Sequence, residues 1–347
     1  MTDSFSPSSD PLVSAIVPLY NGKRVVGATL QSLLVQRSVP YEVIVVDDGS
    51  TDGSATAVVD LTRGDPRVRL LHHPENQGIP RTLNDGLASA RAPYVLILHQ
   101  DCRLIGDDWL VRAIADLQSG DAAGVVGTPI HNPDRMTRME RCFWVIRNHV
   151  VRTIDEPDAP APPFSENKCD LYRRATLLDV GGFPEGFHHG GEDQFLAAEL
   201  RRRSLRVSFV PGLRYELTLG TEVGLRASLR KEAFYGRGIR DVARKVGTPP
   251  GDGSDRGESR GWLVNRAMAL GWPLVLVAAA VLFLLLRLPP YSYLLLVLPP
   301  AARLLQLLFR AARYRNRYRL RATDVAGIPF LGLLADLAYL AGFLSPV

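Results

Sequence analysis

Five short apolar runs alternate with helix-periodic segments over the first 130 residues of the chain. The runs, which predict strands, lie at residues 13–19, 42–48, 68–72, 94–98 and 124–129. Apolar residues recur at helical spacing between them, at residues 26–34, 54–61, 80–90 and 109–117. Repeated strand–helix units of this length build a parallel sheet with right-handed crossovers. The sequence therefore predicts an α/β fold.

The second run ends in an unusual way. It is mostly β-branched from Glu42 to Val46, and it stops at two adjacent carboxylates, Asp47 and Asp48, followed by Gly49. In open α/β sheets, ligands bind beyond the carboxyl ends of the strands. These acids therefore indicate a ligand-binding edge. The alternative is a tight turn in which Asp48 or Ser50 caps the next helix.

Two later segments match this acidic strand end. Residues 73–86 form a turn and a helix that carries Arg81 near its N-terminus, where a phosphate is favoured. The run at 94–98 is followed closely by Asp101. Two parallel strands that end in acids are placed to share one metal-bridged diphosphate, since hard cations take carboxylate and phosphate oxygens together. A helix or turn cap is the alternative for Asp101.

A nicotinamide or flavin dehydrogenase is improbable. Such a fold needs Gly-x-Gly-x-x-Gly directly after the first strand, and this chain has Pro18–Arg24 there. The globular part also lacks the basic charge that nucleic-acid binding needs. From Trp262 onward there are nine Arg and two Asp, so the chain's excess of positive charge belongs to its C-terminal part.

Taken together, the motifs resemble family 2 glycosyltransferases of the GT-A fold over about residues 12–245. The residues that carry the resemblance are Val13–Asn21, Val43–Asp52, Asn76–Gly78, Asn84–Gly86, Asp101, Cys169–Phe183 and Gly191–Phe195. The resemblance implies a Rossmann-like, mixed but mainly parallel sheet with flanking helices. It also implies a nucleotide-binding half at about 12–130 and an acceptor half at about 131–247.

The resemblance assigns roles to particular residues. It gives Asp193 the part of general base, with Glu192 beside it, and Asp101 the part of the metal-proximal acid, with Mn²⁺ or Mg²⁺ as cofactor. Binding of the nucleotide sugar falls to Pro18, Tyr20, Asp47, Asp48, Gly49, Asn76, Gly78, Arg81, His99 and Gln100. Such enzymes invert the anomeric centre by direct displacement, with a carboxylate taking the acceptor's proton. Either acid at 192–193 could instead complement a helix N-terminus.

Two positions depart from the family pattern. His99 stands where the first Asp of Asp-x-Asp is usual, and Pro211–Glu216 lacks a His that many relatives have. A neutral imidazole can ligate Mn²⁺ or bind ribose, so the metal site can survive; weak metal dependence and a structural His are the alternatives. The chain also lacks the Gln-x-x-Arg-Trp run of processive synthases, which favours transfer of a single sugar.

The ends of the chain predict a membrane protein with a cytoplasmic catalytic domain. Residues 1–11 form a polar leader without a signal-peptide core, and 248–261 read as a flexible linker. The membrane domain, 262–347, contains three expected transmembrane helices, at 267–286, 288–309 and 325–345; the alternative for the second is an interfacial segment bent at Pro299 and Pro300. Six Arg in residues 310–321 place that loop in the cytoplasm and the C-terminus outside. Three scattered cysteines without a CxxC pair fit a reducing compartment.

Further segments of the second half carry more specific expectations. Arg303 and Asp336 are expensive in lipid, so we expect them to pair between the second and third spans, or Arg303 to hold the phosphate of a lipid-linked acceptor. Residues 225–246 predict a basic amphipathic helix, either against anionic headgroups or solvated. Residues 131–165 are expected to form a variable loop or a short helix over the acceptor side.

The sequence thus predicts a membrane-anchored, inverting glycosyltransferase. It would move one sugar from a nucleotide-sugar donor to a lipid-linked or cell-envelope glycan acceptor at the cytoplasmic face. Two alternatives remain. A nucleotidyltransferase would also use strand-end acids, but Asn21–Arg24 is a poor triphosphate loop. A catalytically weakened membrane scaffold is the other, and His99 is what favours it.

Overall fold

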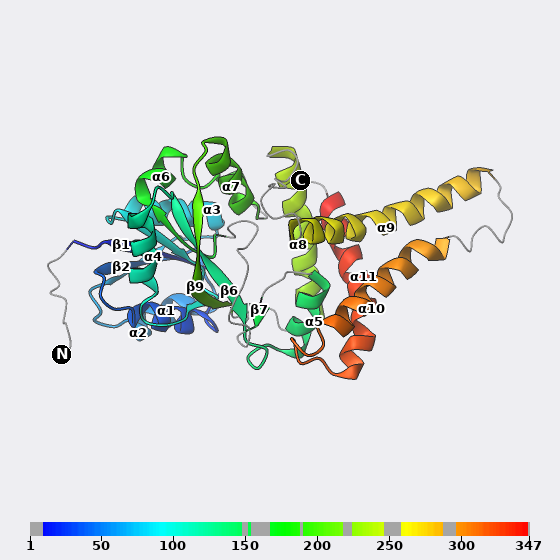
Figure 1. Cartoon of the computed structure of the whole chain (residues 1–347), viewed down its shortest axis with the longest axis horizontal. Helices are drawn as coiled ribbons and strands as arrows, with labels where there is room; N and C mark the ends of the chain where they lie inside the picture. The colour runs from blue at the N-terminus through cyan, green and yellow to red at the C-terminus, as the bar shows by residue number, and fades with distance from the viewer. Residues whose placement is uncertain are drawn as a thin grey trace. The chain divides into compact units, whose positions relative to one another are not determined.

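The computed structural model describes residues 10–147, 152–153, 167–187, 190–217, 224–245, 258–286 and 296–345 (Figure 1). The chain divides into two compact units. The first is a sheet unit, made of residues up to 132 together with 154–221 and 246–250. The second is a helical unit, made of residues 133–153, 222–245 and 251–347.

A mixed, mainly parallel sheet forms the first unit. Among the described residues it has nine strands, in the order β3-β2-β1-β4-β8-β6-β9-β5, with the two-residue strand β7 (Arg152–Thr153) off this path. The other strands are β1 (Val13–Leu19), β2 (Tyr41–Asp47), β3 (Val68–His72), β4 (Tyr94–Leu98), β5 (Cys102–Leu104), β6 (Gly124–His131), β8 (Cys169–Arg173) and β9 (Val207–Leu217). Strands β3, β2, β1 and β4 are parallel neighbours, whereas β8 is antiparallel to both β4 and β6. The α/β fold expected from the alternation is confirmed.

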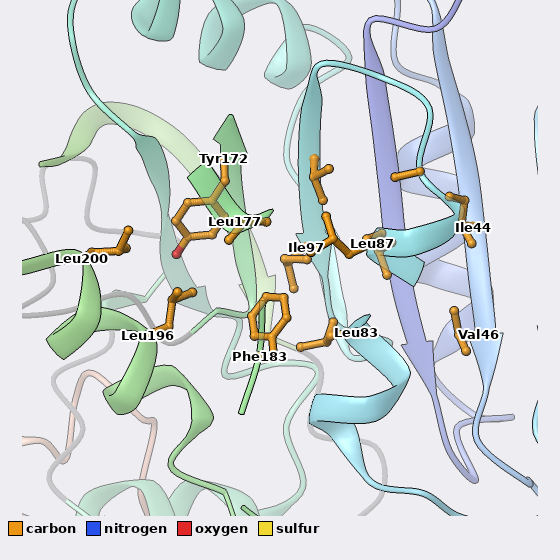
Figure 2. Packing of buried hydrophobic residues seen from close by; sticks show 13 residues of the cluster. Ile44, Val46, Leu83, Leu87, Ile97, Tyr172, Leu177, Phe183, Leu196 and Leu200 are labelled. Carbon is orange, nitrogen blue, oxygen red and sulfur yellow. The ribbon is translucent and has the colours of Figure 1, made fainter. Parts of the chain in front are cut away.

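Helices follow the strands as the periodicity predicts. They are α1 (Val26–Leu34), α2 (Ser54–Leu61), α3 (Ile79–Ser89), α4 (Trp109–Ser119), α6 (Arg174–Asp179) and α7 (Glu192–Arg202). One face of the sheet is covered by α3, α6 and α7, whose buried side chains meet those of the strands (Figure 2). In this cluster, Phe183 and Tyr172 lie between Leu83 of α3 and Leu196 of α7 (Figure 2). Burial of apolar side chains at this scale is what stabilises a domain of this size.

The helical unit combines the three C-terminal helices with two helices from earlier in the sequence. Its members are α5 (Arg138–Arg147), α8 (Leu225–Lys245), α9 (Glu258–Leu286), α10 (Leu298–Arg313) and α11 (Ala322–Leu344). Helix α11 lies at its centre, in contact with α5, α8, α9 and α10. In Figure 1, α8 and α11 lie side by side. The expected basic helix at 225–246 thus forms, and it packs on α11. The division into units also differs from the expected boundary at 247–262, because α5 and α8 belong to the helical unit.

A buried ion pair links α10 and α11, as expected from the rarity of these charges. Arg303 Nε donates to Asp336 Oδ2 at 2.7 Å and Nη2 donates to Oδ1 at 2.9 Å. The Arg303 side chain is 1% exposed and that of Asp336 4%. Trp272 Nε1 of α9 also donates to Asp336, at 3.0 Å, so this carboxylate joins three helices. The sequence-based expectation that the two residues meet is confirmed.

The three expected membrane spans are supported only in part. Among the described residues, α11 is the one helix with the length and apolar composition needed to cross a membrane, and residues 267–283 form a shorter apolar helix. The expected second span coincides in part with α10, which is 16 residues long. A multi-pass arrangement is therefore not supported. The leader 1–9, most of the linker and the Pro-rich part of the loop at 156–163 lie outside the described residues.

Candidate active site

The carboxyl ends of β1 and β2 lie next to each other. Pro18 pairs with Val46 and Leu19 with Asp47 in register, and the Asp48 N–H donates to the Leu19 carbonyl at 2.7 Å. Parallel pairing requires this juxtaposition, because both strands end at the same edge. The sequence-predicted residues 18–20 and 47–49 are therefore brought together.

Both strand-end carboxylates are buried and already accept hydrogen bonds. The Asp47 side chain is 0% exposed and accepts from the Ser50 N–H at 3.3 Å and from His72 Nδ1 at 2.9 Å. Asp48 accepts from the N–H groups of Gln77 at 2.8 Å and Gly78 at 2.9 Å. The two acids thus hold the loops that follow β2 and β3.

A histidine that the sequence analysis did not single out completes this arrangement. The side chain of His73 is 12% exposed. Its Nδ1 lies within hydrogen-bonding distance of Asp48 Oδ1, at 2.8 Å, and its Nε2 lies 3.1 Å from Asp85 Oδ2 on α3. One imidazole therefore bridges two carboxylates. Its position directly after β3, in the sequence His72-His73, is the signal that could have identified it, because strand ends of this sheet face the same edge.

The turn that carries Asn76 depends on glycine. Gly49 has φ +73°, and a Cβ there would lie 2.6 Å from the carbonyl carbon of Glu75 and 2.8 Å from the N of Asn76. Gly78, with φ +89°, precedes α3 and lets its N–H reach Asp48. Asn76 is exposed at the tip of this turn, and both glycines serve the close approach of the two loops.

Arg81, on the first turn of α3, is engaged with acids. Its Nε donates to Asp85 Oδ2 at 2.9 Å, and Nη1 lies 3.6 Å from Glu185 Oε2. The hydrogen bond to Asp85 raises the pKa of Arg81. The side chain is 50% exposed, so a phosphate could still reach it from solvent.

Gln100 holds the loop after β1. Its amide makes two bonds with the backbone of Tyr20: the Tyr20 N–H donates to Oε1 at 2.9 Å, and Nε2 donates to the Tyr20 carbonyl at 3.1 Å. A Cβ on Gly22 would lie 2.2 Å from Gln100 Oε1. Gln100 therefore acts on the loop's backbone, and Tyr20 is left with its ring 46% exposed at the edge.

His99 and Asp101 lie in the turn between β4 and β5. The His99 N–H donates to the Lys168 carbonyl at 2.9 Å, which connects this turn to the strand end of β8. The Cys102 thiol donates to Asp101 Oδ1 at 3.7 Å. Burial, and next the Asp101 charge, raise the pKa of that thiol well above its ordinary value. Cys102 is thus no nucleophile, and Asp101 remains the acid of this turn.

The two acids at 192–193 begin helix α7. Gly191, φ +109°, turns the chain into the helix, and Asp193 Oδ1 accepts from the Gln194 N–H at 2.8 Å. Glu192 is buried, and its Oε2 has no hydrogen-bond partner among the residues that the structure describes. Burial raises the pKa of Glu192, while the N–H groups of Glu192 and Gly191 and the charge of Lys168 oppose that rise. Lys168 thus neighbours both Glu192 and the turn of Asp101.

The loop before α7 is held from α3. Asn84 Nδ2 donates to the Phe183 carbonyl at 2.8 Å and to Glu185 Oε1 at 3.1 Å, and the Phe183 N–H donates back to Asn84 Oδ1 at 2.8 Å. Gly182, φ +73°, leaves room for this contact, because a Cβ would lie 2.6 Å from Asn84 Oδ1. The Asn84-Asp85-Gly86 motif thus connects the two halves of the site.

The side chains of His99 and Asp101 suit a cation that also binds the substrate's phosphates better than they suit a metal ion held by protein ligands alone. Among the described residues, no group of three or more His, Cys, Asp or Glu side chains is placed to hold a metal ion. Asp101 and His99 flank a single turn, and Mn²⁺ or Mg²⁺ often binds through one or two protein ligands plus substrate phosphates. These two residues would hold such a cation once a diphosphate is present.

Comparison with protein families adds the decisive observation. The model of "Glycosyl transferase family 2" matches residues 14–177, which include β1, β2, β4 and β8 and the acids Asp47, Asp48 and Asp101. The chain carries a family 2 glycosyltransferase domain. The resemblance seen in the sequence motifs is thereby confirmed.

Relatives of this family 2 domain agree with the match. An uncharacterized protein of Mycobacterium tuberculosis (strain CDC 1551 / Oshkosh) is 30% identical over 211 residues, 58% of this chain and 65% of that protein. Glycosyltransferase GlyG of Streptococcus pneumoniae serotype 4 is 31% identical over 116 residues, 33% of this chain and 38% of GlyG. The chain spans less than two thirds of the length of either relative.

A solved mannosyltransferase structure shares the fold. It is the mannosyltransferase PcManGT from Pyrobaculum calidifontis, in complex with GDP-Man and Mn²⁺, with a TM-score of 0.55 and 20% identity. The match covers 95% of this chain and 88% of PcManGT. It supports the GT-A architecture of this chain.

Proposed function

We propose that this chain is an inverting glycosyltransferase that moves a single sugar from a nucleotide-sugar donor to a lipid-linked or cell-envelope glycan acceptor at the cytoplasmic face of a membrane. The observation that carries the proposal is the family 2 domain at residues 14–177, whose strand ends bring their acids to one edge of the sheet. The exposed apolar helices of the second unit support a membrane location and an acceptor with a lipid part.

On the donor side, the geometry favours distinct tasks for the predicted residues. Asp47 and Asp48 would shape the pocket by holding its loops, since their oxygens accept from backbone and histidine donors. The exposed ring of Tyr20 offers a face on which a base can stack. Arg81, at the start of α3, would meet the diphosphate.

On the reaction side, the acceptor hydroxyl oxygen forms a bond to the anomeric carbon as the bond from that carbon to the diphosphate oxygen breaks. We assign the acceptor's proton to Asp193, with Glu192 beside it. Asp101 and His99 would hold a divalent cation, which neutralises charge on the departing nucleoside diphosphate. Glu192 is buried whereas Asp193 is partly exposed at the start of α7, so Asp193 is the acid of the two that an acceptor hydroxyl can reach.

The test is a panel of GDP-, UDP- and dTDP-sugars, assayed in detergent with Mn²⁺, Mg²⁺ or EDTA, with an extract of lipid-linked glycans as acceptor. Mn²⁺ with a GDP-sugar is the first combination to try, because PcManGT was solved with both. We expect release of nucleoside diphosphate from one donor, lost by a factor of about 10² or more in Asp193→Asn. Asp101→Ala should lose the cation dependence together with most activity.

Nucleotide binding separates the possible outcomes. Asp193→Asn should bind the nucleotide as the parent chain does, because the amide keeps the size of the side chain. Near-parental turnover in Asp193→Asn would reject the assignment of the base. Pyrophosphate release would indicate nucleotidyl transfer instead, and a parent chain that binds no nucleotide would indicate a scaffold.

A further inference from the structure

Helix α11 is the most apolar long helix of the second unit, and basic side chains hold it at both ends. Near its N-terminus, Arg138 of α5 pairs with Asp324, and its Nη2 donates to Thr323 Oγ1 at 3.1 Å. At its C-terminus, Arg237 Nε of α8 donates to Ser345 Oγ at 3.1 Å. Arg240, also of α8, donates to the Phe343 carbonyl at 3.3 Å. Two polar helices therefore accompany α11 along its length of about 34 Å.

These contacts are built into the core of the unit. Arg147 of α5 donates to Glu232 of α8 at 2.6 Å, and both side chains are 3% exposed, so the two polar helices are tied to each other. Helices α8 and α11 also touch backbone to backbone. A Cβ on Gly236 would lie 2.0 Å from the Tyr339 carbonyl oxygen, and one on Gly342 would lie 1.9 Å from that of Ala233. Helix α11 thus cannot be separated from α8 without breaking the unit.

Helix α8 is too charged to accompany α11 across a bilayer. It carries seven basic residues: Arg226, Arg230, Lys231, Arg237, Arg240, Arg244 and Lys245. Four of them, near the two ends of the helix, are exposed: Arg226, Arg230, Arg244 and Lys245. Charged side chains at the bilayer centre are strongly unfavourable unless they are paired.

The opposite face of α11 is apolar from Ala326 to Leu344. Its exposed positions recur at helical spacing, at Ala326, Phe330, Leu334, Leu337, Ala341 and Leu344. Phe330 is 66% and Leu344 62% exposed. The neighbouring α9 and α10 expose further large apolar residues, among them Leu285 at 75% and Phe309 at 70%. One exposed apolar stripe with a basic helix beside it is the pattern of a helix in the plane of an anionic membrane surface.

We propose that α11 lies in the plane of an anionic bilayer surface instead of crossing it, with the stripe in the acyl region and the exposed arginines of α8 among lipid phosphates. The proposal rests on the membrane attachment proposed above and specifies its mode. It places both ends of α11 on the side of the catalytic domain. This differs from the sequence-based expectation of a third span with an external C-terminus.

The test is cysteine labelling of the full chain in inverted membrane vesicles and in intact spheroplasts of a bacterial host, with a membrane-impermeant maleimide. Ala322→Cys and Ser345→Cys report the two ends of α11. The native Cys102, Cys142 and Cys169 are buried, and burial raises their thiol pKa values, so the parent chain supplies a low background. We expect both introduced thiols to label in inverted vesicles and neither in spheroplasts.

Any pattern in which the two ends fail to label from the same cytoplasmic face overturns the proposal, and labelling in urea verifies that each thiol is present. Vesicle flotation gives a second measurement. Phe330→Glu should lower binding to vesicles of phosphatidylcholine with phosphatidylglycerol at least tenfold, whereas Val59→Glu, at an exposed apolar position of α2 in the sheet unit, should not. Glycosyl transfer measured in detergent is independent of both readouts, so failure of the proposed function would be recognised separately.

Discussion

The two units of this chain bury carboxylates in different ways. In the sheet unit, Asp47 and Asp48 accept mainly from backbone N–H groups and from histidines, in loops at the edge of the sheet. In the helical unit, Asp336 and Glu232 accept from the guanidinium groups of Arg303 and Arg147, inside the helix packing. Because the donors to Asp47 and Asp48 are backbone amides and histidines, we expect the loops at the sheet edge to rearrange when a ligand binds. Arginine pairs fix which helices meet.

The comparison is tested most strongly by breaking an arginine pair. Asp336→Ala leaves the guanidinium of Arg303 buried without its carboxylate, a change that costs about 3–5 kcal/mol in other proteins. We expect most of the chain to be lost from the membrane fraction and the remainder to unfold at lower temperature in detergent. The double variant Arg303→Met/Asp336→Leu, which removes both charges, should recover much of the loss. Unchanged yield and melting in Asp336→Ala would contradict a structural role for the pair.

A methyl group at the α8–α11 crossing should have the next largest effect. Gly342→Ala places its Cβ against the Ala233 carbonyl, and overpacking of this kind costs about 1–3 kcal/mol. Gly327→Ala is the matched control in the same helix, since nothing lies within 4 Å of its Cβ, and alanine there should be neutral or stabilising. The measurement is thermal unfolding of both variants in the same detergent. Equal melting of the two would indicate that the helices do not cross so closely.

A third effect, no larger than the second, is expected at the sheet edge. Asp48→Asn turns one acceptor of the pocket loop into a donor, opposite either the Gly78 N–H or His73, at a cost of about 1–3 kcal/mol. Because the loop can rearrange, we expect a higher KM for the nucleotide sugar with a smaller change in kcat. Asp60→Asn, on the exposed surface of α2, is the control and should leave both unchanged. A fall in kcat alone would place Asp48 in the chemical step instead.

The sheet could be predicted from the sequence because its signals are local. Buried β-branched runs and helical periodicity gave strands at 13–19, 68–72 and 94–98 with the bounds that the structure has. The antiparallel strand β8 was not foreseen as such, because strand direction is decided by partners distant in the chain. His73 was missed for the same reason: its two carboxylates come from β2 and α3.

The helical unit was harder to anticipate. The rarity of charge predicted that Arg303 and Asp336 meet, and the structure confirms it. The amphipathic pattern of residues 225–245 predicted a helix but could not tell a lipid partner from a protein one. The close approach of Gly236 to Tyr339 and of Gly342 to Ala233 shows that α11 is the partner. Hydropathy scores each segment by itself and ignores the helices that pack against it. It therefore predicted more membrane spans than the structure supports.

The place of α11 in the chain has a consequence for synthesis. Helices α5 and α8 emerge from the ribosome well before residues 322–345, to which their packing faces are fitted. At about 5–20 residues per second, the interval between the end of α8 and the end of α11 is roughly 5–20 s. During that time the glycine face of α8 has no helix to cover it. The nascent chain would thus depend on a chaperone, or on the membrane itself, until its last described helix arrives.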